Sequence, residues 1–184
     1  MISPLLYPSS SRLIVVLNGA SSSGKSEICQ AILQLDPNIR CISVDEFLAV
    51  HGYAGHQLIG VVRSEGIGFI HAFHRYIKEE SQQYQLLIVD HVVGECKRWV
   101  DDLKSQCGHI PLLWVKVTCR EDILCKREVQ RSDRKGDIAH ALRQARSIHR
   151  FIEHYALELD SSQALPDELA RQLLSQLATQ RSHV

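Results

Sequence analysis

The stretch LNGASSSGKS, residues 17–26, carries the residue types that bind a phosphate chain. Two glycines, a lysine and a serine within it match the spacing G-x-x-x-x-G-K-[ST]. Glycines let backbone N–H groups converge on phosphate oxygens at a helix N-terminus, the lysine reaches the outer phosphates, and the serine hydroxyl binds Mg²⁺. The loop therefore predicts binding of ATP and Mg²⁺ through Gly19, Ala20, Ser21, Ser22, Ser23, Gly24, Lys25 and Ser26.

Two aspartates follow other apolar runs, Asp45 in CISVDEF and Asp90 in LLIVDHVV. Carboxyl ends of parallel strands meet at one edge of a sheet, so we expect both carboxylates near the loop. Asp90 has the form of a Walker B strand and could hold Mg²⁺ directly or through water, although it could also merely end a strand. Asp45 is a candidate base that accepts a proton from an attacking hydroxyl; the alternatives are a helix cap and a surface turn.

The segment CKREVQRSDRKGD, residues 125–137, places three arginines at i, i+4 and i+7. If the segment is helical, the guanidinium groups share one side, where they could contact phosphate and stabilise charge on a transferring phosphoryl group. We therefore expect a short lid at about residues 126–137, with Arg127 and Arg131 binding nucleotide and Arg131 and Arg134 assisting Lys25 and Asp45 in catalysis. The alternative is a solvated charged face, because Glu128 and Asp133 are interleaved.

The elements that would position these groups alternate along the chain. Continuous apolar runs predict strands at 13–17, 39–44, 85–89, 112–117 and 156–159. Helical patterns fill 25–35, 68–78, 120–131, 137–154 and 166–178. A capping box from Thr118 to Glu121, an N-cap at Asp137 and Pro166 in a first turn support three of these helices. The order predicts an α/β three-layer sandwich in which helices flank a five-stranded parallel sheet.

Length and composition are consistent with one domain over residues 1–184. Lys and Arg total 21 and Asp and Glu total 21, so net charge gives no reason to expect a nucleic acid or a membrane as partner. The apolar runs are too short to cross a bilayer and the N-terminus lacks a basic start, so we expect a cytoplasmic protein. The six scattered cysteines predict buried free thiols rather than disulfides or a structural metal site.

Several motifs together resemble chloramphenicol phosphotransferase and its relatives among the nucleotide-kinase-like P-loop proteins. The resemblance covers most of residues 13–162 and includes LNGASSSGKS, SVDEFL, LLIVDHVV, RWVDDL, LLWVKVTCRED, KREVQRSDR and IEHYALELDSS. Its more specific parts are the spelling of the loop, the LWVKV strand, the arginine segment, and a late stretch with His149, Glu153 or His154, Tyr155, Glu158 and Asp160. The resemblance implies a P-loop NTPase fold and ATP-dependent phosphorylation of a hydroxyl on a small molecule, with the family's proposed base at Asp45.

The chain departs from this family between residue 46 and about residue 67, where EFLAVHGYAGHQLIGVVRSEG replaces the expected acceptor-binding region. Arg63 is the anion-binding candidate in this stretch, while packing or surface roles suit its histidines and those at 71 and 74. The acceptor therefore stays open between an antibiotic, which would imply resistance, and a metabolite, nucleoside or sugar nucleotide. A zeta-toxin-like kinase is a further alternative. A nucleotide-binding switch or slow ATPase acting through a partner belongs to a different class, and the oligomeric state is not predicted.

Overall fold

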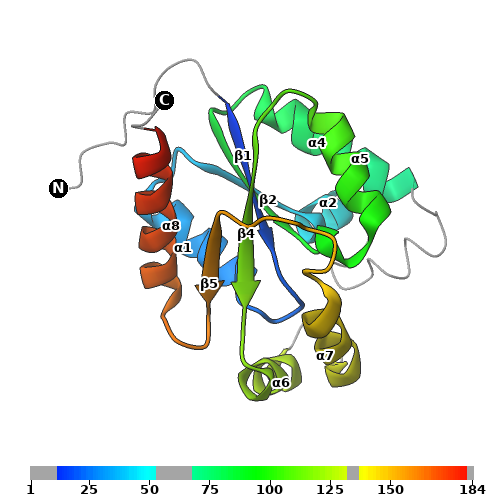
Figure 1. The fold of residues 1–184 in the computed structure, drawn as a ribbon, viewed down its shortest axis with the longest axis vertical. Coiled ribbons are helices and arrows are strands. Elements are labelled where there is room, and N and C mark those ends of the chain that lie inside the picture. Colours follow the sequence, from blue (N-terminus) through cyan, green and yellow to red (C-terminus); the bar gives the residue numbers. More distant parts are fainter. Residues whose placement is uncertain (1–11, 53–67, 132–136, 182–184) are drawn as a thin grey trace.

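The predicted parallel sheet is present, with its five strands in the order β2-β3-β1-β4-β5 (Figure 1). The computed structural model describes residues 12–52, 68–131 and 137–181. The strands are β1 (Leu13–Asn18), β2 (Arg40–Ser43), β3 (Leu86–His91), β4 (Leu112–Thr118) and β5 (Leu157–Asp160). All neighbouring pairs run parallel, as continuous apolar strands covered on both faces are expected to do.

The helices of the described residues were partly predicted. Their bounds are α1 (Lys25–Leu35), α2 (Val44–Val50), α4 (Gly68–Ser81), the 3₁₀ turn η2 (Val93–Glu95), α5 (Lys97–Cys107), α6 (Glu121–Gln130), α7 (Ile138–Ser147) and α8 (Pro166–Arg181). Helix α1 has the predicted bounds, and α8 begins at Pro166 as expected. The sequence did not predict α2, η2 or α5.

Two hydrophobic clusters make the three layers. Alternate residues of β1 face opposite sides, so that Ile14 and Val16 pack with α2, α4 and α5, while Val15 and Leu17 pack with α1 and α8. Figure 1 shows the same division, with α1 and α8 on one side of the sheet and α4 and α5 on the other. The predicted three-layer α/β sandwich is confirmed.

The local predictions around α6 and α7 were less accurate. The capping box from Thr118 is wrong, since Thr118 is the last residue of β4 and α6 has Arg120 at its N-cap with no side-chain cap. Asp137 does cap α7, because its carboxylate accepts the N–H of His140 at 2.9 Å. The helix ends at Ser147 rather than at residue 154, and the following chain packs Ile152 back into the core.

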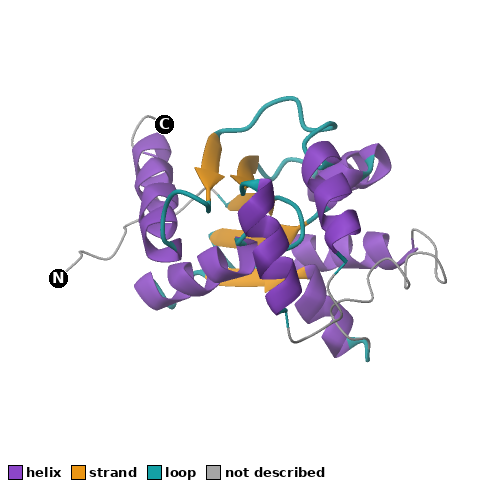
Figure 2. Cartoon of the chain, turned by 90° about the horizontal axis from the view of Figure 1, so that it is seen from below, coloured by secondary structure: helices purple, strands orange, loops and turns teal. Residues whose placement is uncertain are grey.

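The strands share a carboxyl edge that assembles the residues of interest. In the register of the sheet, Asp90 lies between Leu17 of β1 and Ser43 of β2. Helices α6 and α7 lie beyond the lower ends of β4 and β5 in Figure 1, and Figure 2 views this edge from below with helices in front of the strands. The carboxyl edge is therefore covered by helices that are remote in sequence from the phosphate loop.

All six cysteines are free thiols, but Cys29, Cys41 and Cys107 are buried while the other three are half-buried, so full burial was predicted correctly for only half of them. Within residues 12–52, 68–131 and 137–181, no helix has the length and apolar character that a membrane span needs.

Gly94 in η2 is required by a close approach of two segments. A Cβ at this position would lie 2.0 Å from the carbonyl oxygen of Ile148 and 2.7 Å from Nδ2 of Asn18. We expect Gly94→Ala to lower the free energy of unfolding by about 3 kcal/mol, the upper part of the range for overpacking, because a backbone atom must move. Urea unfolding followed by circular dichroism measures this effect. Gly68→Ala is the control, since a Cβ there meets no atom of the described residues within 4 Å. Equal midpoints for both variants would contradict the prediction.

Candidate active site

The phosphate loop connects β1 to α1 in the strand-loop-helix order that its motif requires. Gly24 is the N-cap of α1 and has φ 97°, a conformation that favours glycine. A Cβ at Gly19 would lie 2.5 Å from the carbonyl oxygen of Val117 in β4, so this glycine lets the loop pack against the neighbouring strand. Both glycines of the motif are therefore required by the backbone of the loop.

The loop contains an orphaned polar atom that suits a phosphate ligand. Oγ of Ser23 is the one buried side-chain nitrogen or oxygen in the described part of the chain without a hydrogen-bond partner. Most buried hydroxyls find a partner, and a phosphate oxygen is an acceptor that could supply one. Together with the helix N-terminus after Gly24, this hydroxyl fits a phosphate group better than it fits an ordinary turn.

Asp90 joins the two predicted functional side chains at the start of α1. Its Oδ2 accepts the Ser26 hydroxyl at 2.8 Å, and its Oδ1 lies 3.6 Å from Nζ of Lys25. Lys25 is 7% exposed and Asp90 8%, so water screens this ion pair only weakly. Lys25 also donates to the carbonyl oxygen of Ala20 at 3.0 Å. The two residues predicted to bind magnesium, Ser26 and Asp90, are thus in direct contact, and their role as metal ligands stays a prediction.

Two side chains from α6 and α7 bind the tip of the loop. The carboxylate of Glu128 accepts the hydroxyl of Ser22 at 2.6 Å and that of Ser21 at 3.2 Å. Gln144 accepts the backbone N–H of Ser21 at 2.6 Å. Ser22 has φ 60°, which costs a non-glycine residue roughly 1–2 kcal/mol. The short bond to Glu128, which is 1% exposed, offsets this strain and holds the loop tip in place.

The predicted arginine face does not form on one helix. Arg127 lies in α6, where it donates to the hydroxyl of Ser161 at 2.8 Å and to its carbonyl oxygen at 2.9 Å. Its Nη1 would lie 3.5 Å from a Cβ on Gly24, so the structure does bring Arg127 beside the loop. Arg131 follows the end of α6 in an extended conformation. Arg134 lies outside the described residues, and its predicted role stays a prediction.

Asp45 lies in the first turn of α2, not at the end of a strand as expected. Strand β2 ends at Ser43, whose hydroxyl caps the helix by accepting the N–H of Glu46 at 3.0 Å. Ser43 pairs in register with Asp90, so α2 begins beside the metal-binding candidate and Asp45 is at the carboxyl edge. The Asp45 side chain is exposed. Its role as a base stays a prediction.

Asn18, directly before the loop, connects three segments of the site. Its Oδ1 accepts the N–H of Gly94 at 3.0 Å, and its Nδ2 donates to Ile148 O at 3.0 Å and to the Tyr155 hydroxyl at 2.8 Å. Tyr155 in turn lies 2.9 Å from Nδ1 of His149. Burial lowers the pKa of His149 to about 4, so the ring is neutral at neutral pH and Nδ1 can accept a hydrogen bond from the Tyr155 hydroxyl. Asn18 therefore fixes where the loop leaves β1.

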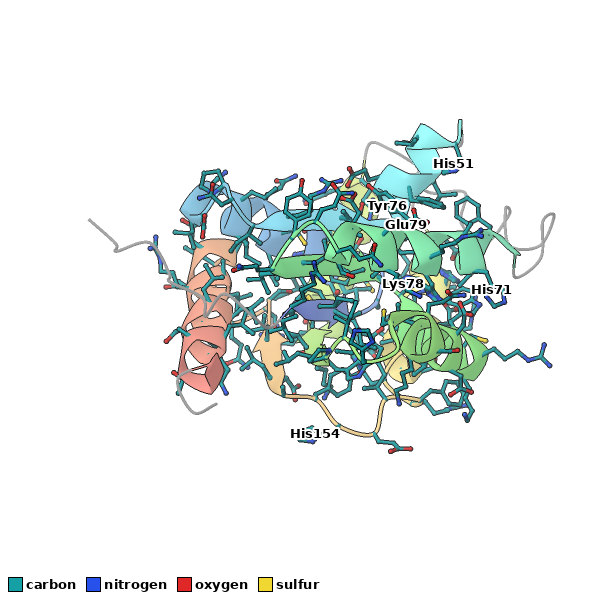
Figure 3. All side chains as sticks on the ribbon, turned by 90° about the horizontal axis from the view of Figure 1, so that it is seen from above. His51, His71, Tyr76, Lys78, Glu79 and His154 are labelled. Atoms are coloured by element: carbon teal, nitrogen blue, oxygen red, sulfur yellow. The ribbon has the colours of Figure 1, made fainter. Side chains whose placement is uncertain are left out.

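His154, by contrast, lies on the segment before β5, far from His51 and Tyr76 (Figure 3). It is exposed. Of the late residues in the resemblance, His149 and Tyr155 therefore reach the site through Asn18, whereas His154 does not.

A chain of buried imidazoles supports the end of β3 behind Asp90. Nδ1 of His91 accepts the N–H of Val92 at 3.0 Å, so its Nε2 carries the proton and donates to Nε2 of His74 at 3.0 Å. Nδ1 of His74 then donates to Asp102 of α5. Burial lowers the pKa of His74 to about 4 and that of His91 well below its usual value, which keeps both rings neutral. These groups have structural roles, in line with the packing roles expected for His74.

Sequence reasoning missed several residues of this site. Glu128 was noticed only as a charge that favoured a solvated face, yet it is buried against the loop. Nothing in the pattern around Gln144, Glu95 or Ser161 distinguishes them, because their contacts join segments far apart in the chain. The one available signal was Asn18, a buried polar residue within an apolar strand directly before the loop.

Comparison with solved structures finds several proteins of similar fold, kinases among them. A shikimate kinase from Acinetobacter baumannii is 12% identical, with a TM-score of 0.65 over 96% of this chain and 98% of that chain. A gluconokinase from Sinorhizobium meliloti is 19% identical, with a TM-score of 0.61 over 94% of each chain. The tunicamycin resistance protein of Deinococcus radiodurans is 14% identical, with a TM-score of 0.63 over 91% and 95%. At these identities the likeness shows the fold alone.

No curated protein sequence matches this chain significantly. The family model described as chloramphenicol phosphotransferase-like protein matches residues 12–178, which covers the sheet, the phosphate loop and both helices over its tip. The chain belongs to the chloramphenicol phosphotransferase-like family.

Proposed function

We propose that this protein is an ATP-dependent kinase that transfers the γ-phosphate to a hydroxyl group of a small molecule. The observation that carries the proposal is the convergence of Lys25, Ser26 and Asp90 at the start of α1, with Asp90 bonded to Ser26 and ion-paired with Lys25. A loop that only stabilised the fold would not need a buried lysine next to it paired with a buried aspartate of β3. Family membership and the kinase fold support the same activity.

Each group has a role that follows from its position. The backbone N–H groups from Ser22 to Ser26 and the Ser23 hydroxyl would bind the phosphate chain. Lys25, now paired with Asp90, would turn its ammonium group to the outer phosphates, where it stabilises negative charge. Arg127 lies beside Gly24 and would place a second cation near the phosphate chain of the nucleotide. Asp45, at the start of α2, would accept the proton of the acceptor hydroxyl.

A magnesium ion fits between Ser26 and Asp90, which offer a hydroxyl and a carboxylate oxygen. These are oxygen ligands of the kind Mg²⁺ prefers, and the ion usually keeps several waters besides one or two protein ligands. Ser26 and Asp90 would hold the ion, which would supply positive charge that offsets the negative charge of the phosphate chain.

The acceptor is proposed to be a small neutral or charged alcohol. The proteins of similar fold include a shikimate kinase and a gluconokinase, whose names refer to hydroxylated acids. The family description names chloramphenicol, which is also an alcohol. This range supports a small hydroxylated molecule and leaves open whether it is an antibiotic or a metabolite.

The test is release of ADP from MgATP across a panel of alcohols that contains chloramphenicol, shikimate, gluconate and a set of nucleosides. The proposal expects at least one acceptor to raise the rate severalfold above hydrolysis by water, with phosphate recovered on the acceptor by mass spectrometry. MgATP binding combined with a rate indifferent to every acceptor would instead support a nucleotide switch or slow ATPase. Failure of the chain to bind MgATP at all would overturn both.

A further inference from the structure

Gln144 lies between the phosphate loop and the 3₁₀ turn that follows β3. Its side-chain oxygen accepts the N–H of Ser21 at 2.6 Å, and its side-chain nitrogen donates to Oε2 of Glu95 at 2.7 Å. Gln144 is 4% exposed, so water does not compete for these two short bonds. A continuous relay of hydrogen bonds therefore runs from the tip of the loop through α7 to η2.

The relay has a single direction. The N–H of Ser21 can only donate, and the ionised carboxylate of Glu95 can only accept. The amide between them must turn its oxygen to Ser21 and its NH₂ group to Glu95, as observed. The reverse orientation would place two donors against each other and an oxygen against a carboxylate. Glu95 therefore determines which end of Gln144 faces the phosphate loop.

Glu95 keeps one oxygen for another ligand. Its Oε2 is bonded to Gln144, while Oε1 has no hydrogen-bond partner among the residues that the structure describes. Glu95 is half-buried and lies in η2, five residues after Asp90, beyond the carboxyl end of β3. Its second oxygen is thus available at the edge of the sheet where the acceptor must approach the loop.

We propose that Glu95 is a positioning residue of the phosphotransfer site, which acts through Gln144 on Ser21 and binds a hydroxyl or ammonium group of the acceptor with its second oxygen. The proposal rests on the kinase function proposed above. One carboxylate makes both contacts, so binding of an acceptor to Glu95 alters the hydrogen bond between Glu95 and Gln144. Acceptor binding at Glu95 and nucleotide binding at the loop therefore influence each other.

An exchange of the two side chains separates this relay from simple packing. Gln144→Glu alone sets a second carboxylate against Glu95, and the two repel each other. Adding Glu95→Gln restores a donor at that end, since the new amide can donate to the new carboxylate, which still accepts the N–H of Ser21. The double variant has the net charge and nearly the volume of the natural pair. Gln83→Glu, at an exposed position after α4, is the control for gain of a charge.

Two measurements follow the relay. The first is the amide proton resonance of Ser21 in the ligand-free protein, which a short hydrogen bond shifts downfield. The second is the Kd for MgADP by calorimetry. We expect Gln144→Glu to move the resonance upfield and to raise the Kd at least tenfold, because a loosened loop tip must be ordered on binding. The double variant should recover the resonance and a Kd within about threefold of the natural protein.

The outcomes distinguish this inference from the proposed function. The relay is wrong if the double variant is no better than Gln144→Glu, or if Gln144→Glu changes neither the resonance nor the Kd. If the natural protein binds no MgADP, the kinase proposal fails and with it the acceptor role of Glu95. The Ser21 resonance then still shows whether Glu95 orients Gln144, because that measurement needs no nucleotide.

Discussion

Alanine at position 25 is expected to lower the rate of phosphate transfer from MgATP about 10²- to 10³-fold, the cost of removing one preorganised group that stabilises developing charge. Lys25 is 7% exposed and has Asp90 as its charged neighbour at 3.6 Å. The substitution removes the cation from the outer phosphates and leaves the Asp90 carboxylate without it. The phosphates and the Asp90 carboxylate then repel each other without a cation between them, so binding of MgATP should weaken as well.

The measurement is the initial rate of ADP release with the acceptor that stimulates turnover most, together with the Kd for MgATP. Lys97→Ala is the matched control, because Lys97 forms an exposed ion pair with Asp101 in α5 and, among the residues that the structure describes, no hydrogen bond or ion pair with the loop. The rate of this variant should stay within twofold of the natural protein. Thermal unfolding shows whether each variant is folded. A folded Lys25→Ala protein with the natural rate would remove Lys25 from the proposed chemistry.

The parts of the site that sequence predicts well are those in which one short segment determines the structure. The loop from Gly19 to Ser26 belongs to a single strand-loop-helix unit, and its glycines are required by contacts within that unit and with β4. The strands are also predictable from short segments, because burial of both faces of the sheet requires apolar residues at successive positions.

Two helices escaped notice although their signals are present. Helix α2 is short, but Ser43 caps it and Asp45 and Glu46 occupy its first turn, a pattern typical of a helix N-terminus. Helix α5 buries Val100, Leu103 and Cys107 at helical spacing. The opposite error occurred in α7, where helical residues continue past Ser147, yet the chain turns so that Ile152 can reach the core. Tertiary packing determines that end, and propensity does not.

The sequence could not predict the hydrogen bonds that α6 and α7 make to the tip of the loop, for a different reason. Glu128 and Gln144 bind Ser21 and Ser22 from more than a hundred residues away. A glutamate between arginines on a helix is usually solvated, and only the position of α6 over the loop makes this one buried. Side chains of this kind depend on how α6 and α7 dock on the loop, where Leu124 and Ala141 pack against Ala20.

The second large effect is expected at Asp45, where asparagine should lower the acceptor-stimulated rate about 10²- to 10⁴-fold, the contribution of a positioned base. Asp45 lies in the first turn of α2, directly after the β2 residue that pairs with Asp90. A carboxylate at this position can accept the proton of an attacking hydroxyl. Asparagine keeps the shape of the side chain but cannot take up the proton. The Kd for MgATP should therefore change by less than about twofold.

Glu46→Gln is the matched control for this prediction. Glu46 is the next residue of the same helical turn, is exposed, and pairs with Arg40 at 3.1 Å rather than serving the loop. Loss of an exposed ion pair costs at most about 1 kcal/mol of stability, so this variant should transfer phosphate at nearly the natural rate. Stimulated turnover that survives Asp45→Asn would show that another group accepts the proton. An equal loss in both variants would instead mean that the start of α2, and not the Asp45 carboxylate, supports the reaction.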